Sequence, residues 1–288
     1  MLVLVDLDGT VYTRSGLIDG AVEALAKLRA AGHVLRFLTN TDSHPTASLR
    51  ATLVERGVPI HEGELFTAVT AAEALLAGAL LARPGDIQVL PVTNKAVAAD
   101  LATRFPTTPG VVHRTPPGGA QAPADRDVHV PVASAGVTTH VVVGDVRSTL
   151  SYELLDAAFR ALRAGAELVA LQKGRFYLDD AGAHVDTGAI VAALEFAAGV
   201  PATVVGKPSV AFLDLAVRSA GRPLPPDQIC MVGDDVLSDV RMGRDAGVRT
   251  VLVRTGKYAL QREVPGAPAP DHEIDSLAVL PALLRGSG

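Results

Sequence analysis

The chain has few of the features that disulfide bonds, zinc sites and membrane spans require. Its single cysteine, Cys230, has no second cysteine with which to form an internal disulfide. The eight histidines show no H-E-x-x-H spacing, so we do not expect a zinc site. The most continuous apolar stretch, residues 74–82, is much shorter than the roughly 20 residues of a membrane-spanning helix. We therefore expect no internal disulfide bond, no zinc site and no membrane-spanning helix.

Neither sign of charge dominates the sequence. The chain has 26 Lys and Arg residues against 31 Asp and Glu residues, a formal net charge of -5, and the two signs are mixed along it. A nucleic-acid-binding protein usually carries a basic patch or stripe. No basic leader precedes the first strand, because Asp6 interrupts the first apolar run. We therefore expect a soluble, cytoplasmic protein with no nucleic acid and no membrane as partner.

Strand and helix patterns alternate at both ends of the chain. Near the N-terminus the apolar spacing predicts strands at residues 2–5 and 34–38 and helices at 19–31 and 45–56. The later part repeats the pattern, with predicted strands at 202–205, 229–232 and 250–253 and predicted helices at 208–220 and 238–246. Alternation of this kind is typical of an α/β fold with one parallel sheet, a Rossmann-like core.

The stretch between these two blocks is longer than a pair of strand-helix units requires. It has its own predicted strands at residues 87–91, 140–143 and 167–171 and a predicted helix at 152–164. We therefore predict a discontinuous core, residues 1–71 and 187–288, with an inserted α/β domain at 72–186. Within the insert, residues 113–136 are rich in Pro, Gly and Ala, which predicts an exposed loop.

Two carboxylates follow the first predicted strand. In extended backbone, residues i and i+2 point to the same side, so Asp6 and Asp8 would lie together, and Gly9 lets the chain turn. Close carboxylates repel unless a cation lies between them or one keeps a proton. Turns rich in Asp and Gly are also common without any such chemistry, and the spacing alone leaves both interpretations open.

Three later clusters also follow predicted strands. Thr39 and Asn40 stand before a helix and would make an anion site or an ordinary cap. Lys207 would either place a fixed positive charge at the edge of the sheet or be an ordinary lysine exposed to solvent. The acids Asp234, Asp235 and Asp239 would hold Mg²⁺ or favour the helix dipole. Because all four clusters follow strands of one predicted parallel sheet, we expect them to converge at its carboxyl edge.

Four motifs in this order resemble the haloacid dehalogenase (HAD) superfamily of phosphohydrolases. They are DLDGT at residues 6–10, the threonine of TNT at Thr39, the lysine of GKP at Lys207, and GDDVLSD at 233–239. The position of the insert resembles class IIA, which carries an α/β cap domain of C2 type. The segments GRFYLDDAG, ALEFAAGVPATVVGKPS and VLVRTGKY are similar to the phospholysine phosphohistidine inorganic pyrophosphate phosphatase group.

The resemblance implies a Mg²⁺-dependent phosphatase with an aspartyl-phosphate intermediate. Asp6 would be the nucleophile and Asp8 the acid and base. Mg²⁺ would be held by the Asp6 carboxylate, the Asp8 backbone carbonyl and Asp234, with Asp235 and Asp239 as supporting acids. Thr39, the Asn40 backbone N–H and Lys207 would hold the phosphoryl oxygens. The family also implies a homodimer formed through the cap.

The substrate is less constrained by the sequence. Phosphate monoesters, pyrophosphate and phosphoramidates all remain candidates, including nucleotides, sugar phosphates and pyridoxal phosphate. In the cap, Asp145 follows a predicted strand and would contact the substrate, or else lie at a solvated edge or a dimer contact. A receiver-like module that accepts phosphate without turnover is the alternative function, although it has no need of the large insert.

Overall fold

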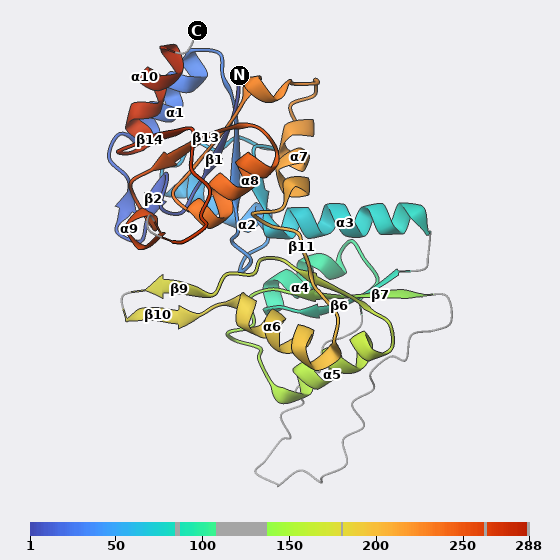
Figure 1. The fold of residues 1–288 in the computed structure, drawn as a ribbon. Helices are drawn as coiled ribbons and strands as arrows, with labels where there is room; N and C mark the ends of the chain where they lie inside the picture. Colours follow the sequence, from blue (N-terminus) through green and yellow to red (C-terminus); the bar gives the residue numbers. More distant parts are fainter. Residues whose placement is uncertain (84–86, 108–136, 180, 262–263, 287–288) are drawn as a thin grey trace. The chain divides into compact units, whose positions relative to one another are not determined.

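The computed structural model describes residues 1–83, 87–107, 137–179, 181–261 and 264–286. The chain forms two compact units, Met1–Ala71 with Val205–Gly288 and Ala72–Val204 (Figure 1). Each unit has its own parallel sheet. The predicted loop at residues 113–136 lies outside the described residues.

The first unit is built on a six-stranded sheet in the order β14-β13-β12-β1-β4-β5. Every neighbouring pair is parallel, as the alternating pattern predicts. The strands are β1 (Leu2–Asp6), β4 (Val34–Thr39), β5 (Leu65–Thr67), β12 (Ile229–Gly233), β13 (Arg249–Val253) and β14 (His272–Ile274). All five residues of β1 are buried, because helices cover both faces of this central strand.

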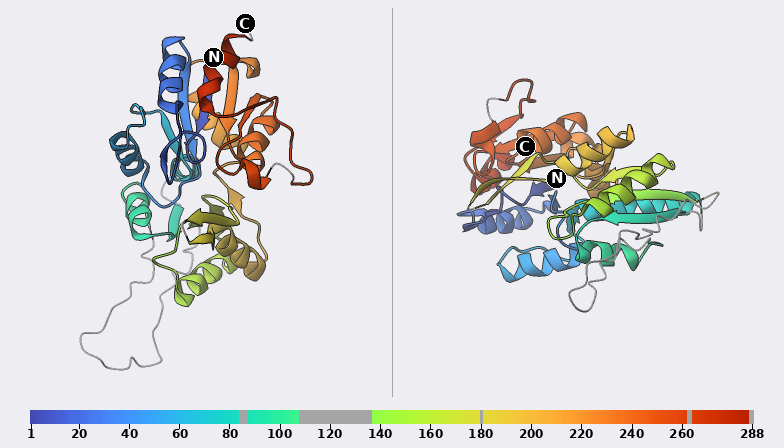
Figure 2. Two further views of the ribbon diagram at one scale, coloured as in Figure 1. Left: turned by 90° about the vertical axis from the view of Figure 1, so that its left-hand side faces the viewer. Right: turned by 90° about the horizontal axis from the view of Figure 1, so that it is seen from below.

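Helices lie on both faces of the core sheet (Figures 1 and 2). Helix α1 (Ala21–Ala30) buries Ala21, Ala24, Leu25 and Leu28, the spacing of one helical face. That face packs with α2 (Thr46–Glu55), α10 (Leu280–Arg285) and the residues Val3 and Val5 of β1. Helices α7 (Val210–Arg218) and α8 (Arg241–Asp245) pack together on the opposite face.

Several short elements complete the first unit. They are the hairpin β2 (Tyr12–Thr13) and β3 (Gly16–Leu17), the helix α9 (Tyr258–Gln261), and the turns η1 (Pro226–Gln228), η2 (Val236–Val240) and η3 (Leu277–Val279). The β2–β3 hairpin directly follows the first pair of aspartates.

The second unit has a four-stranded parallel sheet in the order β11-β8-β7-β6. Its strands are β6 (Ile87–Val92), β7 (Thr138–Val143), β8 (Glu167–Ala170) and β11 (Thr203–Val204), with an antiparallel hairpin of β9 (Phe176–Asp179) and β10 (Gly182–Val185). Its helices are α4 (Lys95–Ala102), α5 (Tyr152–Arg163) and α6 (Thr187–Ala198), and α3 (Ala68–Ala82) begins in the first unit and continues into the second.

The second unit ends later than the sequence predicts. Its start at Ala72 matches the predicted insert, but it continues to Val204 instead of residue 186. Helix α6 belongs to it because Val191, Leu194 and Ala198 pack in one apolar cluster with α5 and the second sheet. The predicted strand at 202–205 is also corrected, since β11 pairs with β8 and not with a core strand.

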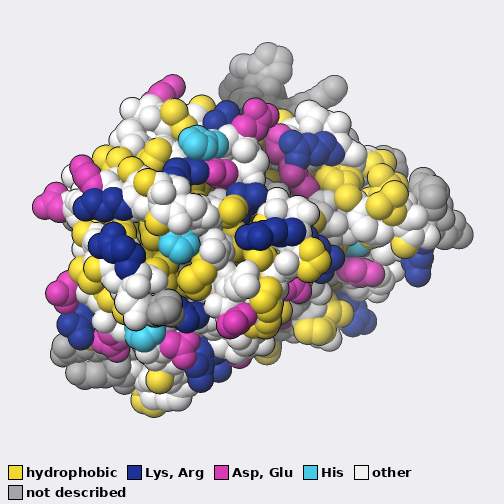
Figure 3. All heavy atoms as spheres, turned by 90° about the horizontal axis from the view of Figure 1, so that it is seen from above, with side chains coloured by type: hydrophobic (Ala, Val, Ile, Leu, Met, Phe, Trp, Pro, Cys, Tyr) yellow, Lys and Arg dark blue, Asp and Glu magenta, His cyan; other side chains and the backbone are white. Residues whose placement is uncertain are grey.

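Charged side chains of both signs lie on the surface. On the face shown in Figure 3, Lys and Arg side chains are interspersed with Asp and Glu. No helix within the described ranges is both long and apolar enough to cross a bilayer.

Candidate active site

The predicted site residues of the core meet at the carboxyl edge of the first sheet. Asp6 is the last residue of β1, Thr39 is the last residue of β4, and Asp234 directly follows β12. Strand β1 lies between the other two, with Asp6 level with Leu38 and Val5 level with Val232. Because parallel strands end at the same edge, these side chains start from neighbouring positions.

A buried lysine joins two of the acids. Lys207 is 5% exposed, and its Nζ lies 2.5 Å from Asp6 Oδ1 and 2.7 Å from Asp239 Oδ1. Burial alone would lower the pKa of Lys207, but the charges of Asp239 and Asp6 outweigh it and raise the pKa. The ammonium group therefore stays charged at neutral pH. The Thr10 hydroxyl donates to the other Asp6 oxygen, Oδ2, at 3.0 Å.

Lys207 reaches the site from a loop, which corrects the prediction that it follows a strand of the core sheet. The strand before it, β11, pairs in the second unit. Asn40 holds the lysine instead: the Lys207 N–H donates to Asn40 Oδ1 at 2.7 Å, and Asn40 Nδ2 donates to the Lys207 carbonyl at 2.9 Å. This reciprocal pair fixes the Lys207 backbone next to the end of β4.

Three carboxylates form a candidate metal centre. One oxygen from each of Asp6, Asp234 and Asp239 lies within 4.8 Å of the others, and all three residues are buried. Burial, followed by the charges of Asp6 and Asp239, raises the pKa of Asp234 to about 9. Lys207 supplies one positive charge to these three acids. Buried carboxylate oxygens in excess of positive charge are a donor set that fits Mg²⁺.

The other two predicted acids have different surroundings. Asp235 Oδ1 accepts from the N–H groups of Leu237 at 2.9 Å and Ser238 at 3.1 Å, so it caps the turn η2. Its Oδ2 accepts from Lys257 Nζ at 3.0 Å. The Asp8 residue is exposed. Surrounding protein atoms nevertheless displace water from its carboxyl group, and this loss of hydration, followed by the charge of Asp6, raises the pKa of Asp8. A raised pKa is the direction that a proton donor needs.

Hydroxyl groups lie at the end of β4. Thr39 is buried, and its Oγ1 accepts from the Thr41 N–H at 3.1 Å and lies 2.9 Å from Thr41 Oγ1. Together with Asn40 and Lys207, this segment gives the cluster a side rich in hydrogen-bond donors. Such a side complements an anionic group placed next to the acids.

Asp145, the residue predicted in the inserted domain, belongs to the second unit and has both oxygens engaged. Arg147 donates to it from Nε at 2.8 Å and from Nη2 at 3.0 Å. The Arg147 guanidinium lies 4.7 Å from the centre of the Tyr177 ring, and that ring stacks on His184. Asp145 therefore orients an arginine within the second unit.

Thr10, Thr255 and Lys257 also contact the site; they lie in the segments DLDGT and VLVRTGKY, to which the sequence gives a family resemblance but no role for these three residues. Thr255 Oγ1 donates to the Gly9 carbonyl, and the Lys257 N–H donates to Asp234 Oδ2. A signal was available, because residues 255–257 follow β13, the strand next to β12 at the same sheet edge. The spacing to the acids, however, spans more than twenty residues and shows no pattern in the sequence.

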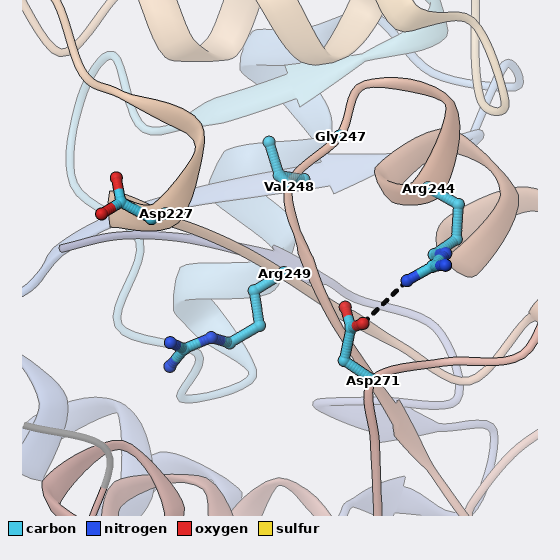
Figure 4. Close-up of a pocket in the computed structure, with 6 residues that line it drawn as sticks. All are labelled: Asp227, Arg244, Gly247, Val248, Arg249 and Asp271. Atoms are coloured by element: carbon cyan, nitrogen blue, oxygen red, sulfur yellow. Dashed lines mark hydrogen bonds and ion pairs between the residues drawn. The ribbon is translucent and has the colours of Figure 1, made fainter.

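A pocket of about 520 Å³ lies at the start of β13, away from these residues (Figure 4). Its lining consists of Asp227, Arg244, Gly247, Val248, Arg249 and Asp271. Arg244 and Asp271 form an ion pair of 2.7 Å. Because this is the amino end of the strand, the pocket includes none of the predicted site residues.

Two family models match most of the first unit, and one of the matches continues into the second unit. A model described as haloacid dehalogenase-like hydrolase matches residues 3–103, and a model described as HAD-hydrolase-like matches residues 204–280. These two ranges contain Asp6, Asp8, Thr39, Asn40, Lys207, Asp234, Asp235 and Asp239.

Relatives match over nearly the full chain. Haloacid dehalogenase-like hydrolase domain-containing protein 2 of Bos taurus is 35% identical over 268 residues, 93% of this chain and 89% of that protein. The phospholysine phosphohistidine inorganic pyrophosphate phosphatase of Xenopus laevis is 32% identical over 284 residues, 96% of this chain and 91% of that protein. The solved structure of a glycerol phosphate phosphatase from Mycobacterium tuberculosis, in complex with magnesium, has a TM-score of 0.76 and 25% identity, covering 97% of this chain and 75% of that chain.

We predict that Asp234→Asn stabilises the protein in metal-free buffer and removes its stabilisation by Mg²⁺. The substitution relieves repulsion among three buried carboxylates, and each kcal/mol relieved raises the melting temperature by about 2–4 °C. The folded wild type holds a proton at Asp234 more tightly than the unfolded chain does, so its stability falls as the pH rises from about 4 toward about 9. The advantage of the variant should therefore grow with pH.

Thermal unfolding with EDTA and with MgCl₂, at pH 5 and pH 8, measures both effects. Asp245→Asn, at an exposed acid on α8, is the matched control and should change neither. A variant that unfolds at a lower temperature than the wild type in EDTA, or that gains as much from MgCl₂, would contradict the prediction.

Proposed function

Because the chain belongs to the haloacid dehalogenase-like hydrolase family, we propose that it is a Mg²⁺-dependent phosphatase acting on small phosphorylated compounds through an aspartyl-phosphate intermediate. One observation carries the proposal. The Asp6 carboxylate lies at the end of the central strand, in contact with Lys207 and Thr10, within a buried cluster with Asp234 and Asp239. A nucleophile, a fixed positive charge and an oxygen-donor metal centre thus occur together.

In the first step, an Asp6 carboxylate oxygen attacks phosphorus in line with the leaving oxygen. The bond from phosphorus to the leaving oxygen breaks as the bond to Asp6 forms. Asp8 gives its proton to the leaving oxygen, a role supported by its raised pKa. The products are the free leaving group and a phosphorylated Asp6.

In the second step, water attacks the phosphorus of the aspartyl phosphate. Asp8, now ionised, takes a proton from this water, and the bond from phosphorus to Asp6 breaks. Inorganic phosphate and the original carboxylate result, so the cycle is balanced without any further reactant. Asp8 thereby acts first as an acid and then as a base, while Asp6 carries the phosphoryl group between the steps.

The remaining site residues would bind the phosphoryl group and the metal ion. Thr39, the Asn40 backbone N–H and Lys207 would hold the phosphoryl oxygens. Asp6, the Asp8 backbone carbonyl and Asp234 would hold Mg²⁺, with Asp235 and Asp239 in support. The proximity of Asp239 to Asp6 and Asp234 supports a direct influence of this third acid on the metal centre. A bound Mg²⁺ ion supplies positive charge that offsets the phosphoryl group and the acids.

One relative is named as a phosphatase of phospholysine, phosphohistidine and inorganic pyrophosphate, and one solved structure is named as a glycerol phosphate phosphatase. These names support a substrate among phosphoramidates, pyrophosphate and phosphate monoesters. In the second unit, Asp145 would contribute to substrate choice by aiming Arg147, since both of its oxygens accept from that side chain. A screen with MgCl₂ across sugar phosphates, nucleotides, pyridoxal phosphate, pyrophosphate, phospholysine and phosphohistidine should identify a preferred member. Turnover of none of them would favour the receiver-like alternative.

The proposed assembly is a homodimer formed through the second unit. Large apolar side chains on two of its helices support this, because Tyr152 on α5 is 82% exposed and Phe196 on α6 is 92% exposed. Light scattering should then give twice the chain mass. A mass near 29.7 kDa would remove the dimer and leave the phosphatase proposal intact.

We predict that the wild type releases p-nitrophenolate from p-nitrophenyl phosphate in the presence of MgCl₂ and that Asp6→Asn lowers kcat by about a thousandfold or more. An amide oxygen is a poor nucleophile, so no phosphorylated enzyme forms. Absorbance of p-nitrophenolate measures the rate, and EDTA should abolish it. Full activity of Asp6→Asn would overturn the assignment of the nucleophile.

We further predict a burst of p-nitrophenolate from Asp8→Asn, close to one equivalent per enzyme, followed by slow turnover. p-Nitrophenolate leaves readily without a proton, so the first step continues, whereas activation of water in the second step is lost. Steady-state kcat should fall about 10²–10⁴-fold. Rapid-mixing absorbance resolves the burst, with Asp6→Asn as the control that shows none. A variant with neither a burst nor a lower kcat would contradict the role of Asp8.

A further inference from the structure

The loop after β13, residues 255–257, contacts both loops that carry the acids. Thr255 Oγ1 donates to the Gly9 carbonyl at 2.5 Å. The Lys257 N–H donates to Asp234 Oδ2 at 2.6 Å, and Lys257 Nζ lies 3.0 Å from Asp235 Oδ2. One short loop therefore makes a hydrogen bond to the backbone after Asp8 and to the side chains of two acids after β12.

The contact to Gly9 bears on the Asp8 carbonyl. The Gly9 N–H donates to the Tyr12 carbonyl at 2.7 Å, while the Gly9 carbonyl accepts from Thr255. Both peptide groups that flank Gly9 are thus held. Because a trans peptide is planar, fixing the Gly9 N–H also fixes the direction of the Asp8 C=O on the opposite side of the same plane. Thr255 completes this restraint from the other side of Gly9.

Two glycines let the 6–10 loop and the 255–257 loop approach Asp234 closely. Gly9 has φ +85 and Gly256 has φ +57, and a Cβ built on either one would collide with the Asp234 carboxylate. The Cβ on Gly256 would also collide with the Gly9 Cα. Asp234 is therefore packed between the backbones of the 6–10 loop and the 255–257 loop, and a shift of one loop must move the others.

We propose that Thr255 and Lys257 are positioning residues for the Mg²⁺ centre, with the 255–257 loop setting the distance between the Asp8 carbonyl and the Asp234 carboxylate. This inference rests on the proposed function, since it concerns the same metal centre. Groups that hydrogen-bond to metal ligands affect the affinity for the metal strongly, and their loss typically lowers that affinity about 10–100-fold.

Thr255→Val is the sharpest test, because valine keeps the shape of threonine and removes the donor to Gly9. We expect the Mg²⁺ dissociation constant, measured by calorimetric titration with MgCl₂, to rise about 10–100-fold. Hydrolysis of p-nitrophenyl phosphate should need correspondingly more MgCl₂, and kcat should return toward the wild-type value at saturating MgCl₂. A loss of folding alone would not produce this shift in the metal requirement.

Two further variants separate positioning from stability. Thr255→Ser keeps the hydroxyl and should restore Mg²⁺ binding. Thr250→Val is the matched control on β13, the strand that precedes the 255–257 loop, because the Thr250 hydroxyl donates to Asp271 Oδ2 at 2.9 Å. It should lower the melting temperature and leave the Mg²⁺ dissociation constant unchanged.

The outcomes are distinguishable from failure of the proposed function. If the wild type binds Mg²⁺ and hydrolyses p-nitrophenyl phosphate while Thr255→Val binds Mg²⁺ equally well, the positioning role is overturned and the phosphatase stands. Equal weakening by Thr255→Val and Thr250→Val would also overturn it, because stability would then explain both. If the wild type neither binds Mg²⁺ nor hydrolyses the ester, the proposed function fails, and the inference fails with it.

Discussion

The ammonium group of Lys207 lies between the carboxylates of Asp6 and Asp239, and the lysine is buried. Burying either acid alone would be costly, because an isolated charge in the protein interior loses its hydration. The lysine offsets that cost and also holds Asp6 at the end of β1. Asn40 in turn holds the backbone of Lys207. Charge balance and geometry at Asp6 thus depend on the same residue.

One positive charge does not balance three close carboxylates. The raised pKa of Asp234, caused by burial and by the charges of Asp6 and Asp239, is the consequence. The excess of negative charge fits a ligand that brings positive charge, as the proposed Mg²⁺ would. The close packing of Gly9 and Gly256 against Asp234 keeps this acid in place despite the repulsion.

The second unit takes more of the chain than its sequence suggests. Helix α6 packs its apolar residues with α5 and the second sheet, and these contacts assign it to the second unit. Strand β11 then ends only three residues before Lys207. The segment that leaves the second sheet therefore leads directly to Lys207, and the strand before this lysine pairs in the second sheet instead of the core sheet.

The sequence by itself determined the family, the parallel α/β class and the core residues that meet at one edge, because strand periodicity and four ordered motifs are local properties. The comparisons confirm the family, and the structure brings Asp6, Thr39, Lys207 and Asp234 to one edge. Only the tertiary structure decided that Asp239 lies with Asp6 and Asp234 in one carboxylate cluster while Asp235 caps η2, that α6 belongs to the second unit, and that Thr255 and Lys257 touch the site. Those features arise from contacts between residues far apart in the chain, and such contacts leave no periodic trace in the sequence.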